Sequence, residues 1–258
     1  MHKVPEESRL AAGKPSMPVA PERIVGELEQ LTRLLVRRVE STSAAAIAAQ
    51  GRWSLALPGG SVAESFLSPL ADAAIDWSRV LVFWIDERAG AADGPDSNYR
   101  LAQESGLLER IDPARVYRMP AEATDLERAA RRYAVLLVQL LGTPPVIDVA
   151  LLGAGPDGHV ASLFPGHPLL QDESRYVAAV LDSPKPPPGR LTMTLPTLTA
   201  AGTVIIGAVG ETKGNAVGDA VSNPRSRSPL ALVLQRAPRT ILMLDPDCAR
   251  AAGIAIDD

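Results

Sequence analysis

The sequence predicts an α/β protein in which a mostly parallel, twisted sheet carries helices on both faces. Short apolar runs with the length of buried strands alternate with amphipathic segments of helical period, as is typical of parallel sheets. The chain is 46% hydrophobic but only 4% aromatic, which favours helices layered on a sheet over an aromatic β-sandwich. No repeat of fixed period and no low-complexity linker divides the 258 residues. We therefore predict a single Rossmann-like domain.

The chain divides into a tail and one folded unit. Residues 1–20 are polar and contain prolines, so we expect a flexible N-terminal tail. This tail has no apolar stretch of the kind that marks a secretory signal. Residues 21–258 should form the one folded domain. The single cysteine, Cys248, excludes an internal disulfide or a cysteine-based zinc site, and we expect it to be buried.

Composition narrows the classes of partner. The formal net charge is −4, and no long basic run or basic-aromatic stripe is present, which argues against nucleic acid. No apolar run reaches the roughly 20 residues that span a bilayer. We therefore expect a cytoplasmic protein that binds neither nucleic acid nor membrane. A small anionic substrate remains compatible with this charge, because a local site can be positive on an acidic protein.

Apolar residues at helical spacing predict the helices. In the first helix this stripe would begin at Ile24, with Pro21 in the first turn, and Ser97 would cap the third. Residues 142–145 contain a glycine and two prolines and should end the fourth helix. The expected helices span residues 21–49, 62–70, 98–111 and 125–141, with shorter ones after Pro196, Lys213 and Asp245.

Short buried runs predict the strands. Residues 229–234 could be helical or extended, and the pattern does not choose between them. The expected strands span residues 53–57, 80–85, 115–119, 146–150, 176–181, 191–195, 203–209 and 240–244.

The first two strands end in residues suited to binding. Gly59, Gly60 and Ser61 follow the first strand and open a helix, a place where backbone N–H groups and the helix dipole can hold a phosphate. The same glycines also fit a plain turn between strand and helix. Asp86 and Arg88 follow the second strand within a run of three charges, where a turn would normally carry glycine, proline or asparagine. In open α/β sheets this edge carries the site.

The strand at 146–150 leads into a glycine-rich stretch that supports two functions. Gly153, Gly155 and Gly158 fit the dinucleotide-binding fingerprint, and an acidic residue follows the next strand. However, Asp157 would repel a pyrophosphate, and Pro156 removes one of the N–H donors. Prolines at 165 and 168 would also cut short the helix that this fingerprint requires. An NAD(P)-binding oxidoreductase is therefore the weaker alternative.

His159 in the same stretch indicates the other function, a phosphate-binding hydrolase or isomerase, more strongly. Imidazole is the usual general base for activating water, and Asp157 is close enough in sequence to fix its tautomer. His167 has no such neighbours and is expected to be a surface or structural residue. His2 lies in the tail.

Five blocks in this order resemble the glucosamine-6-phosphate isomerase/6-phosphogluconolactonase family. The blocks are Pro58-Gly59-Gly60-Ser61, Asp86-Glu87-Arg88 with Ser97-Asn98-Tyr99, the run from Gly153 to Pro165, Arg190-x-Thr192-x-Thr194-Leu195-Pro196, and Gly210-x-x-Lys213. The resemblance implies that residues 21–258 are a lactonase-like catalytic domain. The implied reaction is hydrolysis of 6-phospho-D-glucono-1,5-lactone, with no cofactor and no metal.

The resemblance also assigns roles to residues. His159 would activate water, and Asp157 would orient it. Asp86 would contact sugar hydroxyls or position Arg88. The donor to the developing oxyanion is left open between Arg190 and a backbone N–H of residues 153–158. The phosphate would be held by Gly59, Gly60, Ser61, Arg88 and Lys213, with Arg190 as a further cation near the substrate.

Within this family, the lactonase branch fits better than the deaminase branch. The deaminases carry a glutamate shortly after the histidine, whereas residues 161–164 contain no acid. They also tend to have a tyrosine at the position of Arg88. The chain departs from the lactonase pattern at Val62-Ala63 and at residues 89–91, which affects loop shape. A sugar-phosphate sensor with a decayed site is a third alternative, but the base and the cations are all present. A monomer or small homo-oligomer is expected.

Overall fold

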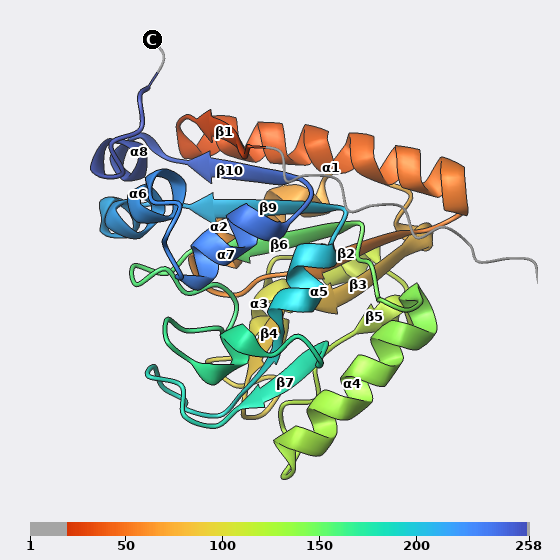
Figure 1. The fold of residues 1–258 in the computed structure, drawn as a ribbon. Helices are drawn as coiled ribbons and strands as arrows, with labels where there is room; N and C mark the ends of the chain where they lie inside the picture. The colour runs from red at the N-terminus through yellow and green to blue at the C-terminus, as the bar shows by residue number, and fades with distance from the viewer. Residues whose placement is uncertain (1–19, 257–258) are drawn as a thin grey trace, which may run out of the picture.

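The computed structural model describes residues 20–256, so the predicted tail at 1–20 lies almost wholly outside the described residues. A seven-stranded sheet, parallel throughout, forms the centre, and Figure 1 shows helices on both of its faces. The predicted fold class is confirmed. Over the described part of the chain, no helix is long and apolar enough to cross a membrane. The strands are, in sheet order, β1 (Glu22–Val25), β10 (Thr240–Leu244), β9 (Thr203–Ala208), β6 (Val149–Gly153), β2 (Trp53–Leu57), β3 (Val80–Trp84) and β5 (Val116–Tyr117).

The helices connect these strands, as parallel pairing requires. Residues 229–234, which the sequence left open, are helical, and Ser228 caps that helix through its side chain. The expected short helices after residues 196, 213 and 245 are present, and Asp245 caps the last one. The helices are α1 (Leu28–Gln50), α2 (Gly60–Ala71), α3 (Asn98–Glu104), α4 (Leu126–Leu141), α5 (Leu195–Ala200), α6 (Gly214–Ser222), α7 (Pro229–Arg236) and α8 (Pro246–Ala251).

The predicted first helix was wrong at its beginning. Residues 22–25 form β1, an edge strand that pairs in parallel with β10. Ile24 fits the apolar stripe of a helix, but it also fits an edge strand, and only the distant partner β10 decides between them. The third predicted helix is also shorter than expected. It ends at Glu104, and Gly106, at φ +76°, separates it from a 3₁₀ turn at Leu107–Arg110.

Three strands form a second, antiparallel sheet that the sequence analysis did not predict. β4 (Asp86–Arg88), β8 (Arg190–Met193) and β7 (Val177–Val180) lie in the order β4-β8-β7. β7 and β8 match the predicted strands at 176–181 and 191–195, but they are joined by a loop too short to carry a crossover helix, so they pair antiparallel. The chain leaves the main sheet after Trp84, and the three charged residues form β4 instead of a turn.

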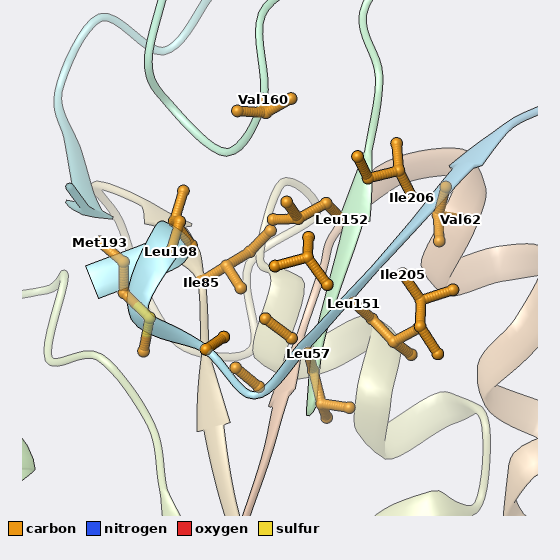
Figure 2. Packing of buried hydrophobic residues seen from close by; sticks show 14 of the residues in the cluster. Leu57, Val62, Ile85, Leu151, Leu152, Val160, Met193, Leu198, Ile205 and Ile206 are labelled. Carbon is orange, nitrogen blue, oxygen red and sulfur yellow. The ribbon is translucent and has the colours of Figure 1, made fainter. Parts of the chain in front are cut away.

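The core between sheet and helices is mostly aliphatic, with four large aromatic side chains, Trp53, Phe66, Phe83 and Trp84, fully buried in it. Leu57, Leu151 and Ile205 come from the three central strands, and Val62 of α2 packs beside them (Figure 2). Cys248 is fully buried, as expected. Burying such side chains contributes roughly 1.5–3 kcal/mol each. This packing fixes the positions of β2, β6 and β9 relative to one another. It therefore also fixes the points at which the loops after these strands begin.

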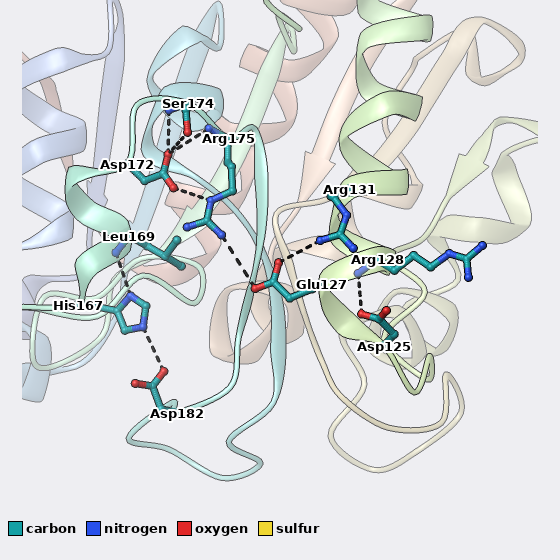
Figure 3. A network of polar contacts seen from close by, with 10 residues as sticks. All are labelled: Asp125, Glu127, Arg128, Arg131, His167, Leu169, Asp172, Ser174, Arg175 and Asp182. Carbon is teal, nitrogen blue, oxygen red and sulfur yellow. Dashed lines mark hydrogen bonds and ion pairs between the residues drawn. The ribbon is translucent and has the colours of Figure 1, made fainter.

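Polar contacts fix the segment that precedes β7 (Figure 3). The carboxylate of Asp172 accepts hydrogen bonds from the backbone N–H and the hydroxyl of Ser174 and from Nε of Arg175, at 2.5–2.8 Å. His167 is structural, as predicted. Its Nδ1 accepts from the backbone N–H of Leu169, and its Nε2 lies 3.2 Å from Oδ1 of Asp182. This segment therefore has a fixed conformation next to the loop that joins β7 and β8.

Replacing Asp172 with asparagine should lower stability in a pH-dependent way. The hydrogen bonds from Ser174, and then Arg175, hold the pKa of Asp172 well below its usual value. Because the folded-state pKa is depressed, this stabilisation is present above about pH 4 and is lost as pH falls towards the folded-state pKa. We expect Asp172→Asn to reduce the free energy of unfolding at pH 7 by about 1 kcal/mol or less, since the turn lies near the surface.

Urea unfolding at pH 7 and at pH 3 measures this effect. The difference between wild type and Asp172→Asn should shrink at pH 3. Asp93→Asn, at an exposed position, serves as the control and should change little. Equal stabilities of wild type and Asp172→Asn at pH 7 would contradict the account.

Candidate active site

The carboxyl ends of the central parallel strands surround one cavity of about 310 Å³. Its walls come from residues 58–62 after β2, residues 153–156 after β6 and Lys213 after β9. Residues of β4 and of the loop between β7 and β8 close the opposite side. The cavity therefore lies where open α/β sheets bind ligands, outside the carboxyl ends of their strands.

One end of the cavity is built to hold an anion. Gly59 is the N-cap of α2, Gly60 adopts a φ of +59°, and no side chain caps the N–H groups of the first turn. Nζ of Lys213 donates a hydrogen bond of 2.8 Å to Oγ of Ser61. Burial lowers the pKa of Lys213. Free N–H groups, a hydroxyl and an ammonium group thus converge on one point, which is the donor set that a phosphate requires.

Asp86 is fixed on the floor of the cavity. Nδ2 of Asn98 donates to the backbone oxygen of Asp86 at 2.8 Å, and Oγ of Ser162 donates to Asp86 Oδ2 at 2.7 Å. Asn98 also explains the glycine at position 59, because a Cβ there would lie 1.8 Å from Asn98 Oδ1. Asn98 and Ser162 belong to the motif blocks of the sequence, but no role was predicted for either. Both position Asp86, and Asn98 is fully buried.

Side chains alternate between the two faces of β4, so its three charged residues have different roles. Asp86 and Arg88 line the cavity, whereas Glu87 does not. The Glu87 carboxylate accepts hydrogen bonds from the backbone N–H groups of Asn98 and Tyr99 at 2.8 Å, and burial raises its pKa. Arg88 Nη1 donates to the backbone oxygen of Asp96. Glu87 thus anchors the start of α3 and holds its two neighbours in register.

His159 and Asp157 form the pair that the sequence predicts. Nδ1 of His159 lies 2.5 Å from Oδ1 of Asp157, so Nδ1–H donates to the carboxylate. Among the described residues, Nε2 of His159 has no hydrogen-bond partner, and the ring lines the cavity. Burial lowers the pKa of His159, and Lys185 lowers it further, against the opposing effect of Asp157. Burial would raise the pKa of Asp157, but His159 holds it below its usual value.

Gly155 makes room for this pair. A Cβ at Gly155 would lie 2.0 Å from Cε1 and Nδ1 of His159. The Gly155 backbone N–H also donates to the backbone oxygen of His159 at 2.9 Å, which closes the loop on itself. This glycine therefore serves the imidazole rather than a nucleotide. The chain after β6 forms turns and a 3₁₀ segment at Pro168–Gln171 instead of a helix, so the dinucleotide-binding alternative loses its required helix N-terminus.

Lys185 is the residue of this site that sequence reasoning missed. It lies in the proline-rich loop between β7 and β8, and its Nζ is 3.3 Å from Nδ1 of His159. Arg190 donates to the backbone oxygens of Lys185, Pro186 and Pro187 at 3.0–3.2 Å, while it also lines the cavity. The two cations of this loop were visible in the sequence, but no motif marked Lys185.

The structure gathers most of the predicted site residues in this one cavity. Asp157 lies behind the imidazole of His159 and does not line the cavity. Within residues 20–256, no group of three or more His, Cys, Asp or Glu side chains is placed to hold a metal ion. The predicted residues that line the cavity are Gly59, Gly60, Ser61, Asp86, Arg88, His159, Arg190 and Lys213.

The fold and site together define an α/β enzyme whose cavity contains the uncapped start of α2 with Ser61 and Lys213, and also the imidazole of His159. The sequence pattern of the glucosamine-6-phosphate isomerases/6-phosphogluconolactonase family matches residues 26–242, and the chain belongs to this family.

Relatives of known name are similar over most of the chain. A 6-phosphogluconolactonase of Streptomyces coelicolor is 41% identical over 78% of this chain and 83% of its own length. A probable chloroplastic 6-phosphogluconolactonase 3 of rice is 38% identical over 78% of this chain, but the match spans only 66% of that longer relative. The structure of a 6-phosphogluconolactonase from Trypanosoma brucei matches with a TM-score of 0.80 at 29% identity, over 89% of this chain and 98% of the other.

Gly155→Ala should displace the imidazole of His159. The added Cβ cannot coexist with the ring at 2.0 Å, so the hydrogen bond to Asp157 should break and the ring should move towards solvent. Its pKa should then rise towards about 6.5, because burial is the main cause of the lowered value. NMR titration of the His159 ring measures this shift.

Gly153→Ala is the matched comparison. A Cβ there meets only Cγ2 of Val62, at 3.2 Å, which a small shift of that methyl group can relieve. The His159 titration should change less in this variant. Identical titration curves for wild type and Gly155→Ala would contradict the role given to Gly155.

Proposed function

We propose that this chain is a 6-phosphogluconolactonase, which hydrolyses 6-phospho-D-glucono-1,5-lactone to 6-phospho-D-gluconate in the second step of the oxidative pentose phosphate pathway. The single observation that carries the proposal is that the His159 ring, paired with Asp157, lines the same cavity as the uncapped N-terminus of α2. The names of the relatives support the same activity. The cavity, at about 310 Å³, has room for one phosphorylated sugar ring.

The substrate phosphate should lie at the N-terminus of α2. The N–H groups of Gly60 and Ser61, the Ser61 hydroxyl and the Lys213 ammonium group are the donors there. Arg88 lines the same cavity, and its Nε is buried without a partner in the described structure. We infer that Arg88 completes the phosphate site, because guanidinium suits phosphate geometry. Asp86 should accept hydrogen bonds from sugar hydroxyls.

The lactone carbon should then lie beside His159. Nε2 takes a proton from water as the water oxygen bonds to C1, and the carbonyl electron pair moves onto the carbonyl oxygen. When that pair returns, the bond from C1 to the ring oxygen breaks, and the imidazolium gives its proton to the leaving ring oxygen. Asp157 holds the imidazole in the correct tautomer and stabilises its charged form. The product forms as the carboxylic acid, which releases its remaining proton to solvent. The step balances without a metal or cofactor, and we propose that none is used.

The deaminase alternative finds no support in the residues after the histidine. Ala161 and Phe164 line the cavity, and the hydroxyl of Ser162 is bonded to Asp86. No carboxylate is available in this segment to assist the opening of a sugar ring. We further propose that the protein acts in the cytoplasm as a monomer or small homo-oligomer. The rice relative named chloroplastic leaves the compartment to be tested by cell fractionation.

His159→Ala should lower kcat by about 10²–10⁴, the usual effect of losing a general base. The assay follows acid release from freshly prepared 6-phosphogluconolactone, with the spontaneous rate subtracted. His167→Asn is the matched control, because asparagine can keep the cap on Leu169 and the position lies outside the cavity. The proposal fails if the wild-type protein does not exceed the spontaneous rate, and the role of His159 fails if His159→Ala retains full activity.

The pH profile of kcat/KM should fall on the acid side only at a low pH. The base must be unprotonated, and burial holds the pKa of His159 below its usual value, with Asp157, Lys185 and Asp86 the charged groups around it. Therefore kcat/KM should fall as the pH is lowered, and the midpoint of this fall should lie below about pH 6.5, the usual pKa of histidine. A midpoint clearly above pH 6.5 would contradict this environment for His159.

A further inference from the structure

Four cationic side chains line the cavity, and three of them are engaged away from the base. Lys213 donates to Ser61 at the phosphate end. Arg88 donates to the backbone oxygen of Asp96. Arg190 uses Nε and Nη2 on three backbone oxygens of its own loop. Lys185 is the cation at the end of the cavity where the base lies.

Hydrogen bonds hold the backbone of Lys185 within its loop. Oγ of Ser183 accepts from its backbone N–H at 3.2 Å and donates to its backbone oxygen at 2.9 Å. Arg190 donates to that same oxygen at 3.2 Å. The backbone N–H of Ser183 also donates to the oxygen of Pro188, which closes the loop. The loop therefore fixes the Lys185 backbone, while its side chain extends to 3.3 Å from His159 Nδ1 and 3.9 Å from Asp157 Oδ1.

The charges at this end require such a cation. Asp157 contacts the imidazole from behind, and Asp86 lines the cavity, so two carboxylates lie near the place proposed for the lactone carbonyl. An oxyanion forming there would be repelled by both carboxylates. A positive group fixed before the reaction offsets this repulsion, and such groups are among the largest contributions to catalysis.

We propose that Lys185 is a further catalytic residue, whose ammonium group donates a hydrogen bond to the C1 carbonyl oxygen and stabilises the negative charge that forms there. The inference rests on the lactonase function proposed above. During the step, water adds to C1, its proton passes to His159 Nε2, and the carbonyl electron pair becomes the oxyanion that Lys185 faces. After the ring C–O bond breaks, the same ammonium group pairs with the carboxylate of the product. Lys185 keeps its proton throughout.

Kinetics of Lys185→Met test the proposal first. Methionine keeps most of the chain length but removes the charge and the donor. We expect kcat to fall by about 10²–10³, the usual effect of losing an oxyanion donor, while KM changes by only a few-fold because the phosphate contacts remain. Lys185→Arg should recover part of the loss. Arg110→Met, at an exposed position outside the cavity, is the charge control and should behave as wild type.

The pH profile separates this role from mere tuning of the base. If Lys185 acted only by keeping His159 unprotonated, Lys185→Met would raise the acid limb but regain the wild-type rate at higher pH. The charged groups facing His159 are Asp157, Lys185 and Asp86. The acid limb of the pH profile therefore reflects their combined effect on the pKa of His159. We expect the loss in kcat to persist across the whole pH range. Recovery at high pH would overturn the proposal.

Ligand binding gives a test that does not depend on turnover. Calorimetry with 6-phosphogluconate and with glucitol 6-phosphate compares ligands that share the phosphate but differ in the carboxylate. Lys185→Met should weaken binding of 6-phosphogluconate about tenfold or more and leave glucitol 6-phosphate unchanged. Equal effects on both ligands would overturn the proposal. If wild type binds both but does not hydrolyse the lactone, the proposed function fails separately.

Discussion

The parallel sheet imposes the constraint on which the site depends. All seven strands of the main sheet point the same way, so the loops after β2, β6 and β9 leave from one edge. The aliphatic core shown in Figure 2 fixes those strands against one another. The loops after them therefore begin at fixed positions. Residues 59–61, 155–156, 159 and 213, far apart in sequence, therefore face one cavity. No single loop holds both the anion site and the base.

The small antiparallel sheet supplies the second wall of the cavity and further charged residues. β4 carries Asp86 and Arg88, and its pairing with β8 brings Arg190 opposite Arg88. Arg190 then holds the loop that presents Lys185 to the imidazole. The site is thus enclosed between two sheets with different tasks. The parallel sheet positions Ser61, Lys213 and His159, and the antiparallel sheet and its loop position Asp86, Arg88, Arg190 and Lys185.

The predictable features were those encoded locally. The Gly-Gly turn after β2 and the Asp-Gly-His run after β6 carry their chemistry within a few residues, so the sequence indicates phosphate and base before any fold is known. Pairing between distant segments was not predictable. Residues 22–25 are a strand because β10 lies beside them, and β7 and β8 leave the main sheet because a short hairpin joins them. Lys185 was missed for the same reason, since only that hairpin brings it to His159.

The central claim is that one cavity binds the phosphate and the reacting carbon at opposite ends. A crystal structure with bound 6-phosphogluconate tests it most directly. The phosphate should lie on the N–H groups at the start of α2, near Ser61 and Lys213, and the carboxylate should lie between His159 Nε2 and Lys185 Nζ. A product bound in the reverse direction, with its phosphate at His159, would contradict the account.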